Sequence, residues 1–443
     1  MIDRADIVIV GCGAAGLFAS IFAGRALRAA GSESTVIGID GARTIGAKIL
    51  VAGGGRCNVT HHRVDDTAYA GSSAGAIRKV LRSFGVEQTR AFFAELGVEL
   101  KQEETGKLFP TTDDAHTVLN ALKNAAADAN VQLVHPWRVA GITREPDHFV
   151  IHKQDDASTL LAQRVVLATG GKSLPKSGSD GAGYELAKSL GHTITPRVFP
   201  ALVPLTLKDG SFMRELSGLT VPTTIELRAA SGKKLRSFTN SMLCTHFGLS
   251  GPGVLDISRY YLDAAAQASE SNQPAPQLLI NWLPDHTMET LDALLIERSR
   301  RPQAPGIGKM LSELLPERLA RELCLQAHVD FARPIAVLTR DERRTICASA
   351  TQTPVPVSGD RGYTFAEVTA GGVPLSEIHL DTMESRVCPG LHLCGELCDV
   401  DGRIGGFNFQ WAWASGHLAG CGAAKSLLAI NNTHAPRREG SQA

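Results

Sequence analysis

The sequence predicts an α/β protein in which a domain built on a parallel sheet is interrupted by an inserted segment. Residues 6–10 (DIVIV) have a buried-strand pattern, residues 14–29 a helical pattern, and residues 35–40 (TVIGID) a second strand pattern. Strand, glycine turn, helix and strand within about 35 residues make a βαβ unit with parallel strands. Apolar and polar positions alternate over 197–257, which is typical of antiparallel strands. Glycine-rich α/β character returns by residue 362.

The remaining elements follow from the same kinds of pattern. We expect helices at 86–96, 114–129 and 180–191, two or three strands within 131–152, a buried strand at 163–171, helical structure over 284–330 and an apolar segment at 334–338. A chain of 443 residues is too long for one ordinary core. The interrupted domain and its insertion are therefore expected to fold as separate units.

The composition is that of a globular protein with balanced charge. Hydrophobic residues make up 43% of the chain and charged residues 20%, and Lys+Arg equals Asp+Glu at 45 each. This balance gives no overall field that attracts nucleic acid or an anionic membrane, so we expect neither as a partner. The apolar N-terminus is interrupted by Gly11, Gly13 and Gly16, and no stretch reaches the roughly 18 residues of a membrane span. We expect a cytoplasmic protein; the sequence does not indicate its oligomeric state.

Nine cysteines lie at scattered positions, an odd number without the spacing of a disulfide framework. Reduced thiols are expected. Cys394 and Cys398 form a C-x3-C pair, and we weigh a redox couple or half of a metal site against small buried residues, which we favour. The sequence contains no HExxH, no Ser–His–Asp pattern and no paired Cys/His metal spacing, so it predicts no metal site and supports neither a hydrolase nor a metalloenzyme.

A glycine pattern between the first strand and the first helix predicts a dinucleotide site. Residues 11–16 (GCGAAG) follow a strand and open a helix, which is the context that the GxGxxG motif requires. Gly11 makes the tight turn, Gly13 lets the backbone approach a pyrophosphate, and Gly16 permits close contact between helix and strand. The helix N-terminus then presents free N–H groups and a positive dipole end to the anion. Asp40, at the end of the second strand, is placed to accept hydrogen bonds from ribose hydroxyls.

Two further segments indicate that the dinucleotide is FAD. Residues 168–171 (ATGG) end a strand, as in flavoproteins where that strand passes the adenine-side half of FAD. Near the C-terminus a strand ends at Gly395 and Glu396, and glycines at 405–406 open an apolar helix. A helix that starts there directs its N-terminal dipole at the flavin N1–C2=O edge, which stabilises the negative charge of a reduced flavin. The chain holds no second strand–GxGxxG–helix unit. Electrons from NAD(P)H would therefore arrive by transient binding at the flavin face; otherwise the substrate reduces the flavin and oxygen or another acceptor reoxidises it.

Residues 46–60 (GAKILVAGGGRCNVT) lead from the second strand toward the expected flavin ring. Their three consecutive glycines let main-chain N–H groups lie against the flavin or the pyrophosphate. Arg56 and Asn58 are expected to donate to phosphate or ring oxygens, and Lys48 is a further cation along that path. Cys57 is expected to be a small buried residue rather than a redox thiol.

Five motifs in order along the chain resemble one bacterial flavoprotein family: KILVAGGGRCNVT, GKLFPTTDDAHTVLNAL, MLCTHFGLSGPGVLDIS, VTAGGVPLSEI and GELCDVDGRIGGFNFQWAWASG. Its members are aminoacetone oxidase-like and 3-dehydro-bile-acid reductase-like NAD(P)/FAD-dependent oxidoreductases. The resemblance implies a discontinuous Rossmann-type FAD-binding domain, an inserted β-barrel-like domain and a small helical domain within that. The expected division is 1–195 and 355–430 for the FAD-binding domain, 196–257 and 334–354 for the β-rich substrate domain, 258–333 for the helical insertion and 431–443 for a flexible tail.

The motifs and the resemblance together imply a set of cofactor contacts. The expected cofactor-binding residues are Gly11, Gly13, Ala14, Ala15, Gly16, Asp40, Lys48, Gly54, Gly55, Arg56, Cys57, Asn58, Val139, Thr169, Gly170, Gly171, Gly395, Glu396, Asp401, Gly405, Gly406, Phe407 and Asn408. Val139 resembles the family position whose backbone meets the adenine. The chain departs from the family pattern after CNVT, where it has His61 and His62 in place of a common asparagine, and at Cys394 and Cys398.

His246, in CTHFGLSGP, is the candidate catalytic base or acid, with a purely structural histidine as the alternative. Arg361, Tyr363 and Glu377 are weaker candidates. The sequence thus predicts an FAD-dependent oxidoreductase that acts on a small organic substrate by hydride transfer at flavin N5, with O2 or NAD(P)H as redox partner. Two alternatives stay open: an FAD-containing RNA-modification factor, and a flavin-binding protein without turnover.

Overall fold

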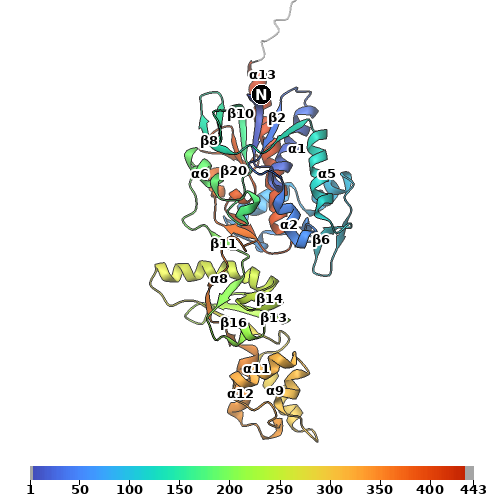
Figure 1. Cartoon of the computed structure of the whole chain (residues 1–443), viewed down its shortest axis with the longest axis vertical. Helices are drawn as coiled ribbons and strands as arrows, with labels where there is room; N and C mark the ends of the chain where they lie inside the picture. The colour runs from blue at the N-terminus through green and yellow to red at the C-terminus, as the bar shows by residue number, and fades with distance from the viewer. Residues whose placement is uncertain (1–2, 435–443) are drawn as a thin grey trace, which may run out of the picture. The chain divides into compact units, whose positions relative to one another are not determined.

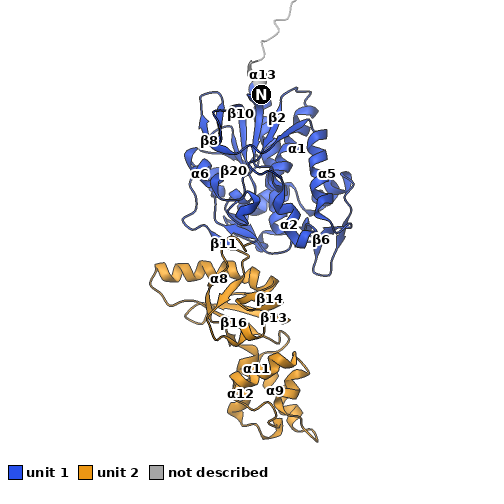
Figure 2. Cartoon of the chain, in the orientation of Figure 1, with its two compact units in different colours: residues 1–200, 367–443 blue, residues 201–366 orange. Residues whose placement is uncertain are grey.

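The computed structural model describes residues 3–434 and divides into two compact units (Figures 1 and 2). Unit 1 comprises residues 1–200 and 367–443, and unit 2 comprises residues 201–366. The chain enters and leaves unit 2 once, so unit 2 is an insertion into unit 1. Its end lies later than the expected 354, because β18 (Val357–Asp360) pairs with β12 (Leu205–Leu207) and keeps that segment in unit 2.

Unit 1 is built on a nine-stranded sheet with a parallel centre. β1 (Arg4–Val10) lies between β2 (Val36–Ile39) and β10 (Thr159–Leu167) and is parallel to both. The strand order is β20-β21-β22-β10-β1-β2-β7, with β8 and β9 attached to β10 through β9. The side chains of Ile7 and Val8, which point to opposite faces, are fully buried, as expected for a central strand covered on both faces. The other strands of this sheet are β7 (Val131–Val134), β8 (Val139–Arg144), β9 (Phe149–Lys153), β20 (Ile378–His379), β21 (Glu384–Ser385) and β22 (Leu391–Leu393).

Smaller elements of unit 1 surround this sheet. Its helices include α2 (Ala47–Gly55), α3 (Ala74–Ser83), α4 (Val86–Glu95), α5 (Ala115–Asp128) and α6 (Ala182–Ser189). Three small sheets pair β3 (Thr60–His61) with β6 (Lys107–Pro110) and β6 with β5 (Leu100–Gln102), β4 (Tyr69–Gly71) with β23 (Val400–Gly402), and β11 (Phe199–Ala201) with β19 (Val368–Ala370). The 3-10 turns of this unit are η1 (Asp66–Ala68), η2 (Pro175–Ser177), η4 (Leu375–Glu377) and η5 (Gly395–Leu397).

The first and last helices of unit 1, α1 (Ala14–Ala29) and α13 (Phe407–His434), pack against each other with their backbones in contact (Figure 1). A Cβ atom built on Gly416 would lie 2.5 Å from the carbonyl oxygen of Ala15. One built on Gly420 would lie 2.3 Å from the carbonyl oxygen of Ala19. Four residues further along α13, the facing residue is also four residues further along α1. The two helices therefore run in the same direction.

Unit 2 combines an antiparallel sheet with a cluster of helices. The seven strands follow the order β17-β16-β13-β14-β15-β12-β18. Those not yet defined are β13 (Thr220–Arg228), β14 (Lys234–Thr245), β15 (Gly248–Ser250), β16 (Gln277–Asn281) and β17 (Thr353–Pro354). The helices are α7 (Phe212–Glu215), α8 (Pro252–Glu270), α9 (Met288–Ser299), α10 (Ile307–Ser312), α11 (Glu317–Gln326) and α12 (Arg340–Thr351), with the 3-10 turn η3 (Ile335–Val337). The helix α8 packs on β13 and β14.

The division inside unit 2 differs from the expected one. The strand β16 lies within 258–333, expected to be helical, but it pairs with β13 and belongs to the sheet. The helix α12 lies within 334–354, expected to be β-rich, but it packs on α9 and α11. Its start carries a signal that pattern analysis overlooked, because the Thr339 hydroxyl accepts a hydrogen bond from the backbone N–H of Glu342 in a capping box.

The C-terminal helix also extends beyond the expected limit. α13 continues to His434, so residues 431–434 are helical where a flexible tail was expected, and the rest of that tail lies outside the described residues. Across residues 3–434, every helix is too short or too polar to cross a bilayer.

The contact between α1 and α13 predicts unequal effects of two glycine substitutions. Gly420→Ala places a methyl group against the backbone of α1, and we expect a loss of about 1–3 kcal/mol in the free energy of unfolding. Gly75→Ala on α3 is the matched control, because a Cβ there meets nothing within 4 Å. It should leave stability unchanged or raise it by up to about 1 kcal/mol. Urea unfolding followed by tryptophan fluorescence, to which Trp411 and Trp413 of α13 contribute, measures both, and equal midpoints would contradict the close packing.

Candidate functional site

The three glycines after β1 have three different surroundings. Gly11 has φ +98°, and a Cβ on it would lie 2.5 Å from the carbonyl oxygen of Ala168, at the end of β10. A Cβ on Gly16 would lie 1.8 Å from the carbonyl oxygen of Gly11. A Cβ on Gly13, by contrast, meets nothing within 4 Å. The first and third glycines are therefore needed by the fold, whereas the second faces open space beside the N-terminus of α1.

The N-terminus of α1 is suited to hold an anion. Gly13 is its N-cap residue, no side chain in the described part of the chain caps it, and its first turn contains no acidic residue. The first N–H groups of an α-helix have no acceptor within the helix. Together with the positive end of the helix dipole, these donors can bind a pyrophosphate.

Asp40 joins the end of β2 to the glycine turn. Its Oδ2 accepts a hydrogen bond of 2.7 Å from the backbone N–H of Cys12, and its Oδ1 accepts one of 2.8 Å from that of Ala42. Each carboxylate oxygen keeps a lone pair for a further donor. The carboxylate is thus fixed in place and able to accept from the hydroxyl groups of a ribose.

The end of β10 contains buried polar atoms that the protein leaves unsatisfied. Within residues 3–434, Thr169 Oγ1 and Ser179 Oγ have no hydrogen-bond partner although both are buried. Asn58 Oδ1, after the glycine run, is in the same state. Buried polar atoms without partners are rare in proteins, and they fit a site that is completed by a ligand with hydroxyl or N–H donors.

The glycine run at 53–55 is required by the backbone itself. Gly53, Gly54 and Gly55 have φ values of +60°, +70° and +87°, and Cys57 has +60°. These left-handed conformations interrupt α2 and cost little only for glycine. A Cβ on Gly54 would meet nothing within 4 Å, so the main chain lies open there.

Arg56, directly after this run, is already bound within the protein. Its guanidinium donates a 2.6 Å hydrogen bond to Glu103 and lies 4.0 Å from the ring centroid of Phe109. The hydrogen bond to Glu103 is the main reason that the pKa of Arg56 is raised. Its expected contact with a phosphate stays a prediction, and the structure gives it a second task, which is to tie α2 to the loop at 103–106.

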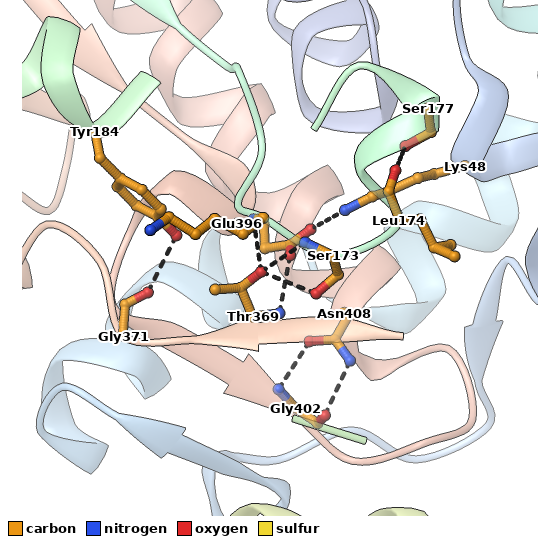
Figure 3. Close-up of polar contacts among 11 residues, drawn as sticks. Lys48, Ser173, Leu174, Ser177, Tyr184, Thr369, Gly371, Glu396, Gly402 and Asn408 are labelled. Carbon is orange, nitrogen blue, oxygen red and sulfur yellow. Dashed lines mark hydrogen bonds and ion pairs between the residues drawn. The ribbon is translucent and has the colours of Figure 1, made fainter. Parts of the chain in front are cut away.

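Lys48 and Glu396 form the centre of a polar cluster (Figure 3). Lys48 Nζ donates to Glu396 Oε2 at 2.7 Å, and the backbone N–H of Thr369 donates to Glu396 Oε1 at 2.9 Å. The Thr369 hydroxyl accepts from the backbone N–H groups of Lys172 and Ser173 at 2.7 and 3.0 Å. The cluster therefore joins α2, the loop after β10, β19 and the segment after β22. Two expected cofactor residues, far apart in sequence, lie side by side.

The N-terminus of α13 has its own glycine turn. Gly405 and Gly406 have φ values of +122° and +93°, and a Cβ on Gly406 would lie 2.6 Å from the carbonyl carbon of Thr60. The side-chain amide of Asn408 accepts from Gly402 N at 2.8 Å and donates to Gly402 O at 2.9 Å (Figure 3). Asn408 thereby closes the turn that precedes the helix, a role that sequence analysis did not assign to it.

The residues around this turn are also fixed by the fold. The carbonyl oxygen of Phe407 accepts a 2.8 Å hydrogen bond from the Tyr69 hydroxyl. The Phe407 ring stacks on His61 with centroids 4.9 Å apart. Asp401 is buried in β23, opposite Ala70 of β4. His61, one of the two departures from the family pattern, is therefore part of the wall beside the α13 N-terminus.

Polar side chains within α13 anchor it, and sequence analysis missed them. The Gln410 Oε1 atom accepts from the hydroxyls of Thr60 and Thr89 at 2.6 and 3.0 Å. Trp411 Nε1 donates to Gly395 O at 3.0 Å, and Trp413 Nε1 donates to Val59 O at 2.8 Å. The sequence held the signal, since Gln410, Trp411 and Trp413 all carry hydrogen-bonding groups within a mostly apolar stretch of the helix. They hold the segments at 58–60 and 395–396 beside α13.

The spacing of the two helix N-termini matches an elongated ligand. α13 begins nine residues before Gly416, whereas α1 begins one residue before the facing Ala15. Because the helices run in the same direction, the N-terminus of α13 extends about 12 Å beyond that of α1, at about 1.5 Å per residue. Two positive dipole ends thus face the same side, one beside the β1 turn and the other farther along.

The remaining candidates lie elsewhere. His246, Arg361 and Tyr363 belong to unit 2, and a contact of any of them with the cofactor stays a prediction. Val139 is buried at the start of β8 in unit 1. Glu377 accepts a 2.7 Å hydrogen bond from the ring of buried His192, which indicates a structural role.

These features define a class of protein. A Rossmann-type flavoprotein site has three parts, and all three are present here. They are a parallel sheet with a GxGxxG turn, a fixed acid at the end of the second strand, and a second glycine turn at a distant helix N-terminus. FAD fits this site, because it would fill the open space at Gly13 and offer partners to the unsatisfied atoms of Thr169 and Asn58. The N-terminus of α1, Asp40 and the N-terminus of α13 would hold it.

Comparison with known proteins identifies the family. Residues 5–422 match the family described as HI0933-like protein Rossmann domain, and the chain belongs to this family. It is 35% identical over 421 residues to the 3-dehydro-bile acid delta(4,6)-reductase of Clostridium scindens, covering 95% of this chain and 99% of that protein. It is 34% identical over 419 residues to the ribosomal RNA dihydrouridine synthase of Escherichia coli, covering 93% of this chain and 96% of the relative.

A solved structure supports the fold. The FrdA chain of E. coli quinol fumarate reductase is similar with a TM-score of 0.50 at 15% identity, covering 97% of this chain and 72% of that chain. The fold class, the family, FAD and the oxidoreductase class are confirmed. The exclusion of nucleic acid as a partner is not supported, because one relative named above is an RNA-modifying enzyme.

The surroundings of the glycines predict that two substitutions act differently. Gly13→Ala puts a methyl group into the open space, so we expect FAD affinity to fall about tenfold or more while the melting temperature of the apoprotein stays unchanged. Gly16→Ala collides with the backbone of Gly11, and it should lower the melting temperature of the apoprotein itself. Titration with FAD and thermal unfolding of both variants test this, and a destabilised Gly13→Ala apoprotein would contradict it.

Burial predicts that the cysteines beside the site are chemically inert. Burial raises the pKa of Cys57 to about 12, and it raises the pKa of Cys394 and Cys398 far above the usual value. A protonated thiol is a poor nucleophile. We expect these thiols to react with a disulfide reagent at about pH 8 only after unfolding, and Cys398→Ser to leave the rate of flavin reduction unchanged. Fast labelling of the folded protein, or loss of flavin reduction in the variant, would instead indicate a redox couple.

Proposed function

We propose that this protein is an FAD-dependent reductase that adds a hydride and a proton across a carbon–carbon double bond conjugated to a carbonyl group, with NAD(P)H as the electron source. The names of the two relatives support this reaction type. A 3-dehydro-bile acid delta(4,6)-reductase saturates a carbon–carbon double bond of a 3-oxo compound. A dihydrouridine synthase saturates the double bond of uracil, which is conjugated to a ring carbonyl. The substrates differ, but the bond that gains two hydrogens is of the same kind.

The observation that carries the proposal is the pair of helix N-termini on one side of unit 1, of which that of α13 extends about 12 Å beyond that of α1. Bound FAD supplies two-electron chemistry at its N5 atom. The N–H groups of α1 hold the pyrophosphate, and Asp40 orients the ribose. The N-terminus of α13 stabilises negative charge at the ring, which favours the reduced cofactor. The ion pair of Lys48 and Glu396 fixes the segment between these two ends.

The remaining parts of the reaction fall to groups outside this cluster. NAD(P)H would bind only transiently at the flavin face, since the sequence contains no second dinucleotide motif, and would supply the hydride. The substrate would gain that hydride at the carbon β to its carbonyl group and a proton at the α carbon. His246 is the proposed proton donor. One NAD(P)H and one proton are used for each double bond.

Separate half-reactions test this proposal. The purified protein should be yellow, and NADH or NADPH should bleach it without oxygen. A 3-oxo-4,6-diene steroid or a uridine-containing RNA should then restore the colour in a one-to-one ratio. If an amine bleaches the flavin and air restores it with the same stoichiometry, the protein is an oxidase. If no donor bleaches it, the protein is a flavin carrier without turnover.

The proposed proton donor makes a prediction for one half-reaction only. His246→Ala should slow reoxidation by the substrate by roughly 10²- to 10⁴-fold, whereas bleaching by NAD(P)H should keep its rate. His379→Ala is the control, because His379 is an exposed histidine of unit 1. Stopped-flow absorbance of the flavin measures both steps. If the rate of flavin reoxidation by the substrate is unchanged in His246→Ala, another group is the proton donor.

RNA as the substrate is the second candidate, favoured by the ribosomal RNA dihydrouridine synthase among the relatives. The balanced charge of the whole chain does not oppose it, since RNA can bind to a local basic surface.

A further inference from the structure

We propose that unit 2 contains an RNA-binding surface formed by the end of the β13–β14 hairpin and the adjacent face of α8. This surface, called here the hairpin–helix surface, comprises Arg228, Lys233, Lys234, Arg236 and Tyr260. The inference rests on the proposed function and specifies its substrate class, a uridine within an RNA chain.

The hairpin end carries a local excess of positive charge. Residues 226–236 contain four cations and one acid, Glu226, in a chain whose cations and acids are equal in number overall. Glu226 pairs with Arg228 and lies 3.5 Å from Lys234, so one carboxylate is shared by two cations. Lys233, Lys234 and Arg236 are exposed. Such a cluster suits the phosphodiester backbone of a nucleic acid.

An aromatic ring lies directly beside these cations. The guanidinium of Arg236 is 4.9 Å from the ring centroid of Tyr260. The guanidinium of Arg259, the residue before Tyr260 in α8, is 5.8 Å from the same centroid. Phe238 of β14 packs with its ring centroid 5.8 Å from that of Tyr260. The ring is thus held against the hairpin, and the proposal gives it the role of a stacking partner.

A groove of about 350 Å³ lies between the hairpin and α8, with Arg236 and Tyr260 among its lining residues. The groove is lined by Leu227, Leu235, Arg236, Tyr260, Asp263, Ala264 and Gln267. Leu235 supplies apolar area and Gln267 supplies hydrogen-bonding groups, whereas Leu227 is buried and Asp263 is paired with Arg259 at 3.1 Å. A cation and an aromatic ring beside a groove, with further cations on the same hairpin, are features by which proteins hold single-stranded nucleic acids.

RNA fits this arrangement better than other anionic partners. A membrane surface would use the cations and an apolar face, but here Leu235 is the exposed large apolar side chain of the hairpin, and Tyr260 is half-buried. An acidic protein segment would use the cations but not the groove. A base between polar and apolar walls uses both.

Fluorescence anisotropy of the FAD-loaded protein with a labelled, uridine-rich single-stranded RNA tests the proposal at several salt concentrations. The double variant Lys233→Gln/Lys234→Gln should weaken binding at low salt and reduce the slope of log affinity against log salt by roughly 0.7 for each cation removed. Tyr260→Ala should weaken binding about tenfold at every salt concentration with little change in slope, and Tyr260→Phe should restore it.

The matched control is Arg340→Gln/Arg344→Gln, which removes two exposed cations from α12 in the same unit. The control should bind like the parent protein. Equal losses in both double variants, or binding to vesicles of anionic lipid but not to RNA, would overturn the proposal. Bleaching of the flavin by NAD(P)H and its reoxidation by a 3-oxo-4,6-diene steroid are measured on the same samples. If both flavin reactions proceed while RNA binding is absent, the hairpin–helix surface is refuted as an RNA-binding site and the proposed reaction is retained. If RNA binds but no acceptor is reduced, the proposed reaction is refuted and the RNA-binding surface is retained.

Discussion

The direct contact between the backbones of α1 and α13 is the constraint on which the site of unit 1 depends. Gly416 and Gly420 let the last helix approach the carbonyl oxygens of Ala15 and Ala19. The contact fixes the direction of both helices and their offset, and therefore the distance between their N-termini. Both N-termini therefore present the positive ends of their dipoles on the same side of unit 1, as an extended cofactor with an anionic middle and a distant ring would require.

The polar interactions of the site act mainly on the protein itself. Asn408 closes a turn, Gln410 and Trp413 hold the segment at 58–60 against α13, and Arg56 is paired with Glu103. These contacts place bare backbone where the cofactor needs donors. A flavin needs few reactive side chains, since its own chemistry supplies the redox step. This explains why glycines and anchoring residues dominate the site while candidate acids and bases are few.

Unit 2 folds around a hydrophobic core separate from that of unit 1. Its sheet and helices have a core of their own, built from residues such as Leu249, Trp282 and Leu323. The relatives named for a bile acid and for ribosomal RNA share the reaction type and differ in the size of the substrate. The proposals above assign the redox site to unit 1 and the binding of an RNA substrate to residues 201–366.

The sequence by itself determined the local features: the β1–α1–β2 unit, the glycines at 11, 13 and 16, Asp40 and the FAD class. These depend on backbone conformations and periodicities within a few residues, which local sequence encodes. It did not determine that Lys48 meets Glu396, 348 positions away, or that Arg56 is bound to Glu103. It also misplaced β16, because a short apolar run fits a strand or a helix until its neighbours are known, and α12, whose capping box at Thr339 and Glu342 was overlooked. Only the tertiary structure decided these points, since packing of distant segments selects the partners of each side chain.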